Sequence, residues 1–337
     1  GYLARVEEQL DLAGVSHAVF DQIKPNPTLK NVMDGAAAVK DNGCDFVIGL
    51  GGGSSMDAAK AIAFAAANPG DLWDYSFSMT GGQKERENDP LPIVCITTTA
   101  GTGSEVDPWG VITKEETNEK SGFASGESMY PVLSIVDPDL MMTVPPALTA
   151  YQGMDAFFHA SESVLNTKNH PMGEMFALKA IELLASYLPR AVRDGSDQEA
   201  RAQVALANSL AGYYMLCISA HSLAHAISGF YPELPHGAGL IMIAHAYYQH
   251  FADLKACEGQ MIKMAKAMGV ENPVSGQDFV NALDQLLADC NVAELKMSDY
   301  GITPESLKQF PAHTRKIGGG DISADPVELT DKDMLDI

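Results

Sequence analysis

Basic residues are scarce in this chain, which carries 22 Lys and Arg against 44 Asp and Glu, a formal net charge of −22 at pH 7. Nucleic acids and anionic membrane surfaces bind proteins through a concentrated positive patch. The acidic residues are spread along the sequence rather than gathered in a tail. We therefore expect neither nucleic acid nor a membrane as a partner. A phosphorylated small molecule stays compatible, because backbone N–H groups and helix N-termini can bind it without a lysine cluster.

Cysteine is also scarce, and its five copies show no CxxC spacing. An odd number of scattered cysteines is typical of reduced, buried thiols rather than of a disulfide framework. No uninterrupted apolar run reaches about 18 residues, the length that would suggest a membrane helix. The N-terminus lacks the charged-then-apolar pattern of a signal peptide. We expect a cytoplasmic protein.

The first part of the chain alternates between helical and strand-like segments. Apolar residues at helical spacing predict two helices, over residues 2–14 and 28–41. Short apolar runs predict four strands, over residues 17–20, 45–50, 92–99 and 131–137. Alternation of this kind indicates βαβ units and a parallel sheet, and therefore an α/β domain.

The pattern changes after Pro145 and Pro146, where short strand-like runs disappear and apolar residues recur at helical spacing. A chain of 337 residues is long enough for two domains, and we place the boundary here. The pattern predicts helices over residues 150–165, 172–192, 200–227, 239–251, 259–268 and 276–288, and the start of another over 330–337. Residues 318–326 are expected to form a loop.

A glycine-rich loop, GGGSSMD, joins the predicted strand over residues 45–50 to a strong helix former over residues 58–63. Glycines let a backbone come close to a diphosphate, and the free N–H groups at the start of the next helix point at it. The spacing is not GxGxxG, so this is not the usual Rossmann fingerprint. The alternative is a tight turn that Ser54 or Ser55 caps.

A second loop of small polar residues, TTTAGTGSEV, follows the predicted strand over residues 92–99. Ligands of open α/β sheets bind at the carboxyl ends of the strands, and threonine hydroxyls beside glycines can bond ribose or phosphate oxygens. Taken alone, a run of small residues can also pack a crowded turn. Two such loops at strand ends together favour a bound dinucleotide.

Histidines are concentrated in the segment HSLAHAISGFYPELPHG. His221 and His225 are one helical turn apart, and His236 follows a proline. Upstream, Asp155 and His159 are also four residues apart, so each pair can face one point in space. Three imidazoles with one carboxylate suit a divalent transition metal such as iron or zinc. Taken alone, the upstream pair could instead be a salt bridge on a helix surface.

Together these segments resemble the iron-containing, group III alcohol dehydrogenase family, and the resemblance covers nearly the whole chain. It rests on five motifs in the family's order: GGGSSMDAAKA (51–61), TTAGTGSEV (98–106), IVDPDL (135–140), GMDAFFHASE (153–162) and HSLAHAISGFYPELPHG (221–237). The resemblance implies a Rossmann-like, parallel-sheet dinucleotide domain over residues 1–146 and an all-helical domain for metal and substrate over residues 147–337. NAD or NADP would lie in the cleft between them.

The resemblance also implies roles for the residues at the family's motif positions. The metal, Fe²⁺ or in its place Zn²⁺, would be bound by Asp155, His159, His221 and His236. His225 would help proton transfer or shape the substrate site near the nicotinamide, and the alternative is that it only supports a ligand. The cofactor would be bound by Gly51, Gly52, Gly53, Ser54, Asp57, Thr98, Thr99, Thr102, Ser104 and Lys120. The first four of these would hold the diphosphate.

The implied activity is hydride transfer between NAD(P) and a small alcohol or aldehyde, in a homodimer or larger homo-oligomer. The alternatives are a glycerol-dehydrogenase or dehydroquinate-synthase-like enzyme of the same architecture and a non-catalytic scaffold. Relative to the family, the chain lacks the first sheet strand with its acidic residue that favours NAD, and it lacks a few C-terminal residues. The loop between His225 and His236 is also slightly longer. Neither the preference between NAD and NADP nor the substrate can be inferred from the sequence.

Overall fold

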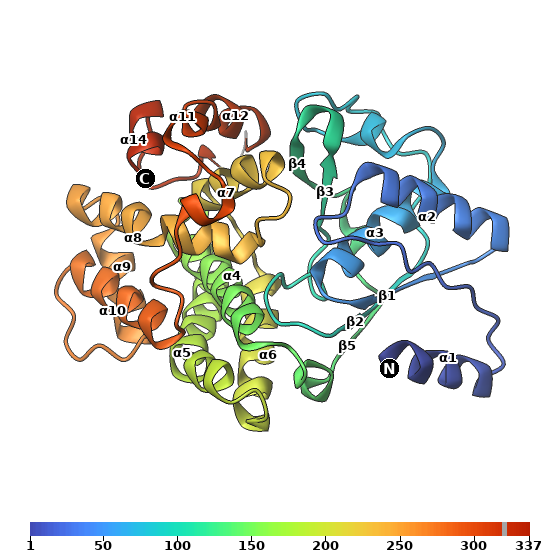
Figure 1. The fold of residues 1–337 in the computed structure, drawn as a ribbon, viewed down its shortest axis with the longest axis horizontal. Coiled ribbons are helices and arrows are strands. Elements are labelled where there is room, and N and C mark those ends of the chain that lie inside the picture. The colour runs from blue at the N-terminus through green and yellow to red at the C-terminus, as the bar shows by residue number, and fades with distance from the viewer. Residues whose placement is uncertain (319–321) are drawn as a thin grey trace. The chain divides into compact units, whose positions relative to one another are not determined.

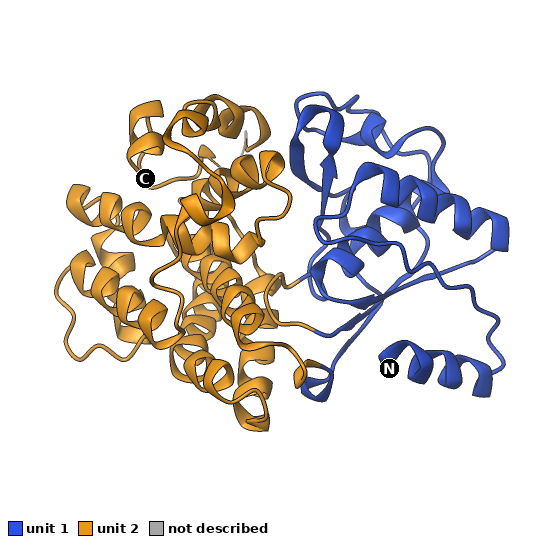
Figure 2. Ribbon diagram, in the orientation of Figure 1, with its two compact units in different colours: residues 1–98, 104–140 blue, residues 99–103, 141–337 orange. Residues whose placement is uncertain are grey.

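The computed structural model describes residues 1–318 and 322–337, which form two compact units (Figure 2). Unit 1 comprises residues 1–98 and 104–140, and unit 2 comprises residues 99–103 and 141–337. This division by contacts falls slightly before the domain boundary expected after residue 146, and it assigns the short segment 99–103 to unit 2. None of the described helices combines the length and the apolar character needed to cross a membrane.

Unit 1 is built on a three-stranded parallel sheet with the order β1–β2–β5 (Figure 1). The strands are β1 (Val47–Gly51), β2 (Ile93–Thr97) and β5 (Leu133–Val136). Helices α2 (Leu29–Asn42) and α3 (Gly53–Ala67) pack on each other, and α3 also packs on β1. A Cβ on Gly49 of β1 would lie only 2.9 Å from the Cβ of Ala59, so glycine lets α3 approach the sheet closely. The α/β character predicted from the sequence is confirmed.

The remaining elements of unit 1 are short. They are helix α1 (Tyr2–Leu12), strands β3 (Gly110–Lys114) and β4 (Glu119–Phe123), and the 3₁₀ turns η1 (Leu72–Tyr75), η2 (Glu115–Thr117), η3 (Glu127–Met129) and η4 (Pro138–Met141).

Two features of unit 1 differ from the sequence prediction. The strand predicted over residues 17–20 is wrong: this segment forms no strand, and Phe20 packs instead against the apolar core around α2 and α3. The antiparallel pair β3–β4 was not predicted, because its strands, GVITK and EKSGF, contain no apolar run. The turn between them has Asn118 in the left-handed region, with φ 54°.

Unit 2 is all-helical, as expected from the spacing of its apolar residues. Its helices are α4 (Pro146–Leu165), α5 (Pro171–Arg193), α6 (Gln198–Tyr213), α7 (Ser219–Phe230), α8 (His236–Leu254), α9 (Glu258–Ala267), α10 (Gly276–Asp289), α11 (Pro304–Leu307), α12 (Phe310–Ile317) and α14 (Asp331–Asp336), with the 3₁₀ turn η5 (Met297–Tyr300). Of these, α11 and α12 were not predicted. The predicted loop over residues 318–326 includes residues 319–321, which lie outside the described residues.

Helix α4 occupies the centre of unit 2, where it packs on α5, α6 and α8 (Figure 1). Every residue from Gly153 to Leu165 is buried. A helix buried on all sides can carry polar groups only where they are paired inside the protein. The buried charged and polar side chains of α4 therefore form a candidate site.

The single helix predicted over residues 200–227 is wrong, because the chain breaks between α6 and α7. Within the break, the N–H of Leu216 donates to Ser163 Oγ at 2.9 Å, and the N–H of Ile218 donates to Glu162 Oε2 at 2.5 Å. Both acceptors lie on α4, so tertiary hydrogen bonds replace the helical ones. The segment YMLCI contains no Gly or Pro that would mark this break in the sequence.

Segment 99–103 belongs to unit 2 because it packs closely on α4 and α6. A Cβ on Gly101 would lie 2.9 Å from the Cα of Gln152, and one on Gly103 would lie 2.7 Å from the Cα of Gly212. The N–H of Gly103, which has φ +67°, donates to Asn208 Oδ1 at 3.0 Å. The small residues of this loop thus serve tight packing, which was one of the two interpretations left open by the sequence.

Candidate metal and cofactor sites

Four side chains of unit 2 converge on one point. Asp155 and His159 come from α4, His221 from α7 and His236 from the first residue of α8. The Nε2 atoms of the three histidines lie 3.7, 3.4 and 3.5 Å from Asp155 Oδ1, in chain order. Donor atoms about 2.0–2.2 Å from a tetrahedral metal lie roughly 3.4 Å from one another. Each histidine and Asp155 are therefore spaced as two ligands of one metal ion would be.

The four side chains differ in their exposure. Those of Asp155, His159 and His221 are buried, whereas 21% of the His236 side chain is exposed. The rings of His159 and His221 stack with their centroids 4.4 Å apart. The donor atoms of Asp155, His221 and His236 all lie within 4.8 Å of one another. The cluster is thus closed on the side of α4 and most accessible beside His236.

A buried carboxylate fixes the orientation of His221. Its Nδ1 lies 2.5 Å from Oε1 of Glu162, which is completely buried. This bond assigns the proton to Nδ1, so Nε2 presents a lone pair toward Asp155. Nε2 is buried and makes no hydrogen bond within the described residues. A bare ring nitrogen facing a carboxylate oxygen is the arrangement that a metal cation between them stabilises, so these residues fit a metal.

Burial and charge act differently on two of the imidazoles. Burial lowers the pKa of His159 to about 4, although the charge of Asp155 favours protonation. Burial also lowers the pKa of His221, but electrostatic interactions with Cys217 and Glu162 outweigh it and raise that pKa well above its usual range. The groups around His221 thus favour a cation, either a proton on the ring or a metal ion.

Sequence reasoning did not place Glu162 in the site. In the structure it bonds His221 on another helix and the backbone of Ile218. No local pattern in the sequence indicates such a contact, because Glu162 and His221 lie on two helices that are far apart in the chain.

His225 lies beside two of the four converging side chains. Its ring centroid is 5.0 Å from that of His236 and 6.1 Å from that of His221. The side chain is half-buried. This position is compatible both with proton transfer and with support of a ligand, so its role stays a prediction.

The glycine loop of unit 1 joins the end of β1 to the start of α3. Gly51 has φ +143°, and a Cβ there would lie 2.5 Å from Ser55 Oγ, so this position requires glycine. Gly52 is the N-cap of α3 and provides no side-chain cap, and neither Ser54 nor Ser55 occupies the capping position. The first N–H groups of α3 are thus oriented as an anion-binding helix terminus requires.

Two residues predicted to bind the cofactor, Asp57 and Ser104, are buried and hydrogen-bonded within unit 1. Asp57 Oδ1 accepts from Ser104 Oγ at 2.6 Å, and its Oδ2 accepts from the N–H of Val111 at 2.9 Å. The ammonium of Lys60, which is completely buried, donates to Ser104 Oγ and to Asp107 Oδ1, both at 2.9 Å. These bonds tie the start of the segment after residue 103 to α3, within unit 1. The cofactor roles of Asp57 and Ser104 stay predictions.

The other predicted cofactor residues lie in different places. The N–H of Thr98 donates to the carbonyl of Gly51 at 2.9 Å, which joins the two loops at the end of the sheet. Thr99 and Thr102 belong to the segment of unit 2. Lys120, on β4, is buried and donates to Asn26 Oδ1 at 2.9 Å. The cofactor roles of all four stay predictions.

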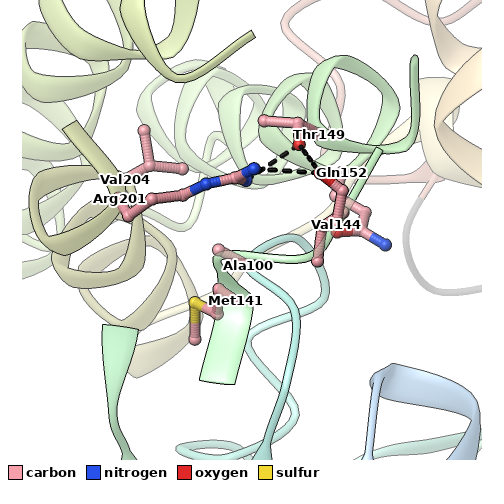
Figure 3. Close-up of a pocket in the computed structure, with 7 residues that line it drawn as sticks. All are labelled: Ala100, Met141, Val144, Thr149, Gln152, Arg201 and Val204. Atoms are coloured by element: carbon pink, nitrogen blue, oxygen red, sulfur yellow. Dashed lines mark hydrogen bonds between the residues drawn. The ribbon is translucent and has the colours of Figure 1, made fainter. Parts of the chain in front are cut away.

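A small cavity in unit 2 lies near Arg201, as Figure 3 shows. The guanidinium donates to Thr149 Oγ1 at 2.8 Å and to the carbonyl of Val144 at 2.9 Å. The cavity volume is about 10 Å³, which is roughly the space of one water molecule. It is too small for a substrate.

Two family models match the chain, which is also similar to known alcohol dehydrogenases. The model described as iron-containing alcohol dehydrogenase matches residues 1–138, and the Fe-containing alcohol dehydrogenase family, C-terminal model matches residues 149–337. Alcohol dehydrogenase 4 of Schizosaccharomyces pombe is 33% identical over 334 residues, covering 98% of this chain and 76% of the relative. The 1,3-propanediol dehydrogenase of Klebsiella pneumoniae is 37% identical over 311 residues, covering 91% and 74%.

A solved structure shows the same fold. The crystal structure of an archaeal halo-thermophilic alcohol dehydrogenase from a Red Sea brine pool matches with a TM-score of 0.92 at 35% identity. The match covers 99% of this chain and 86% of that one.

Proposed function

Because this chain belongs to the iron-containing alcohol dehydrogenase family, we propose that its metal ion is held by Asp155, His159, His221 and His236. The enzyme moves a hydride between NAD(P) and an alcohol or aldehyde, as its family does with a divalent metal. The observation that carries the site is the convergence of three Nε2 atoms on Asp155 Oδ1 at 3.4–3.7 Å. Three imidazoles and a carboxylate accept Fe²⁺ and Zn²⁺ alike, and we propose Fe²⁺ by analogy with the family.

The bound metal would supply Lewis-acid chemistry at the substrate oxygen, and NAD(P) the hydride acceptor. Residues of the chain orient the ligands, keep them unprotonated and transfer the proton. Glu162 holds the Nδ1 proton of His221 and so directs Nε2 into the site. The low pKa of His159 keeps this ring neutral at neutral pH, so no proton competes for its nitrogen. His225, half-buried next to His236, accepts the proton that the alcohol loses and passes it toward solvent.

The glycine loop would hold the dinucleotide diphosphate through the N–H groups of Gly51, Gly52, Gly53 and Ser54. The uncapped start of α3 supports this assignment, because its helix dipole and free N–H groups favour an anion. Thr98, Thr99, Thr102 and Lys120 would line the rest of the cofactor groove. Asp57 and Ser104 would act indirectly, by fixing the loop backbone to α3.

The substrate, by analogy with relatives such as the 1,3-propanediol dehydrogenase, would be a short alcohol or its aldehyde. A homodimer or larger homo-oligomer and a cytoplasmic location stay predictions from the sequence. Light scattering of the purified protein and cell fractionation would test them.

The test of the site is NAD(P)-linked turnover of short alcohols before and after chelation. We expect chelation to abolish the formation of NADH or NADPH and added Fe²⁺ or Zn²⁺ to restore it. His236→Ala should lower activity at least about a hundredfold, since it removes a ligand at the accessible side. The matched control is His245→Ala on the same helix, whose exposed ring contacts only Asp284 at 2.9 Å among the bonds described. Wild-type protein that binds neither metal nor dinucleotide would contradict the proposal.

Product analysis separates the alternative functions. Net formation of NADH with a simple alcohol supports the proposal, whereas phosphate release without net NADH would indicate a dehydroquinate-synthase-like lyase. A scaffold would show no rise in melting temperature with dinucleotide. The relatives named as alcohol and propanediol dehydrogenases favour the first outcome.

A further inference from the structure

A cysteine lies next to the proposed metal ligands. Cys217 is half-buried in the break between α6 and α7. Its Sγ and one ring nitrogen each of His159 and His221 all lie within 4.8 Å of one another. The thiol therefore belongs to a group of three donors that shares two imidazoles with the four-residue set.

Hydrogen bonds of both neighbouring residues fix the backbone at Cys217. The preceding residue, Leu216, donates its N–H to Ser163 Oγ at 2.9 Å, and the following residue, Ile218, donates its N–H to Glu162 Oε2 at 2.5 Å. Both acceptors lie on α4, the helix that also carries His159. The position of Sγ relative to the imidazoles is thus set by the same hydrogen bonds that break the helix.

His221 is common to both donor groups. Its Nδ1 is engaged by Glu162, which leaves the buried Nε2 as the atom that can bind a metal. Nε2 lies 3.4 Å from Asp155 Oδ1, and only 4% of His221 is exposed. While Nδ1 stays bonded to Glu162, both groups depend on the one lone pair of Nε2, so they cannot be filled at the same time.

We propose that Cys217, His159 and His221 form a second metal position that overlaps the first and takes thiophilic divalent ions such as Zn²⁺, Co²⁺ and Cd²⁺. The inference rests on the proposed metal site and adds a donor to it. Thiolate sulfur favours these softer ions, whereas the oxygen of Asp155 favours harder ones such as Fe²⁺. Zn–S bonds of about 2.3 Å and Zn–N bonds of about 2.0–2.1 Å need donors roughly 3.5 Å apart, within reach of the observed group. The thiol proton is released to solvent when the metal–sulfur bond forms.

The two overlapping positions imply that thiophilic ions compete with the iron of the four-residue site. An ion held by Cys217 would occupy the nitrogens of His159 and His221 and leave Asp155 and His236 without a metal. Cadmium, the most thiophilic of these ions, should therefore inhibit the iron-loaded enzyme when it is added in excess.

The test is a titration of the metal-free full chain with Co²⁺, followed by absorption spectroscopy. Cobalt bound to nitrogen and oxygen gives weak visible bands, and a cobalt–thiolate bond adds an intense charge-transfer band in the near ultraviolet. We expect the near-ultraviolet band in the wild type at one Co²⁺ per chain. Cys217→Ser should lose at least nine tenths of this band while still binding one ion, and His236→Ala should keep it. The control is Cys44→Ser, which changes the other half-buried thiol, in unit 1.

A second measurement needs no variant. Cd²⁺ should slow the alkylation of Cys217 by iodoacetamide at least tenfold, mapped by mass spectrometry, and should leave Cys44 unchanged. A wild-type cobalt complex without the charge-transfer band, or equal alkylation of Cys217 with and without Cd²⁺, overturns the inference and leaves the four-residue site intact. A chain that binds no Co²⁺ at all would instead contradict the proposed function.

Discussion

At the scale of single residues, the carboxylate of Glu162 offers a test of the proposed metal site. Glu162 orients the proposed ligand His221 but is not itself a proposed ligand. Glu162→Gln keeps the shape, but an amide cannot accept from both His221 Nδ1 and the Ile218 N–H through two oxygens. We expect metal affinity to fall about 10–100-fold, as is usual when the partner of a metal-bound histidine is lost. Competition with a chromogenic chelator measures this. Glu233→Gln, an exposed change in the loop before His236, should have no effect.

The buried Asp57 predicts a pH dependence of stability in unit 1. Burial raises the pKa of Asp57 from 3.8 to about 6, against the opposing charge of Lys60. The folded chain therefore keeps a proton that the unfolded chain has already lost, so this contribution is complete below about pH 4 and is lost as the pH rises through about 6. The difference in pKa corresponds to about 3 kcal/mol.

Comparison with Asp57→Asn isolates that contribution, because the amide does not titrate. The free energy of unfolding of the wild type, measured by urea denaturation, should fall relative to the variant between about pH 4 and 7 and then stay level. Lys60 also bonds Ser104 and Asp107, and we expect both bonds to persist in the variant. A difference that does not change with pH would show that Asp57 is already ionised throughout.

The residues of the metal cluster were partly predictable from the sequence. His159 and His221 are each one turn from a second candidate, and this spacing selected them together with Asp155. Glu162 and Cys217 were missed, because their contacts arise where α7 meets α4, between segments far apart in the chain. Spacing along one helix predicts which side chains share a face, and it carries no information about the helix opposite.

At the scale of elements, the junction of α8 with α4 positions His236. A Cβ on Gly237 would lie 2.0 Å from the carbonyl oxygen of Tyr151 on α4. Gly237→Ala must push the start of α8 away from α4 and so move His236 away from Asp155. We expect at least a tenfold loss of metal affinity, by isothermal titration calorimetry, and a lower melting temperature.

Gly259→Ala is the control for this change. Gly259 lies in α9, and nothing lies within 4 Å of the position its Cβ would take. Alanine favours a helix over glycine by about 1 kcal/mol, so this variant should be as stable as the wild type or slightly more so. Equal metal affinity in both variants would show that the α4–α8 junction does not position the ligand.

Element prediction succeeded where local pattern and tertiary environment agree. The parallel strands and the long helices of unit 2 have strong apolar periodicity, and both were found. The break after Tyr213 was missed because side chains of α4, rather than Gly or Pro, satisfy its backbone. The strand expected over residues 17–20 was wrong because, among the described residues, no strand pairs with the backbone of this segment, and Phe20 packs against the core of unit 1.

At the scale of the whole molecule, the proposed ligands for metal and diphosphate divide between the two units. All four metal ligands lie in unit 2, and the glycine loop lies in unit 1. Metal at a hundredfold excess over its Kd should stabilise the state that binds it by about 2.7 kcal/mol. Chelation should therefore speed amide hydrogen exchange in α4 and α7, and much less in α2 and α3. Addition of NAD should protect the start of α3. Equal effects of chelation on both units would contradict the assignment.

Segment 99–103 has a consequence for any attempt to recombine this protein with its relatives. Unit 2 is discontinuous in sequence, so a cut at residue 140 yields a fragment without the glycines that contact Gln152 and Gly212. A chimaera built with one crossover would combine segment 99–103 of one parent with helices α4 and α6 of the other. The loop and these helices approach so closely that side chains from different parents would clash. Exchange of a complete unit requires junctions after residues 98, 103 and 140.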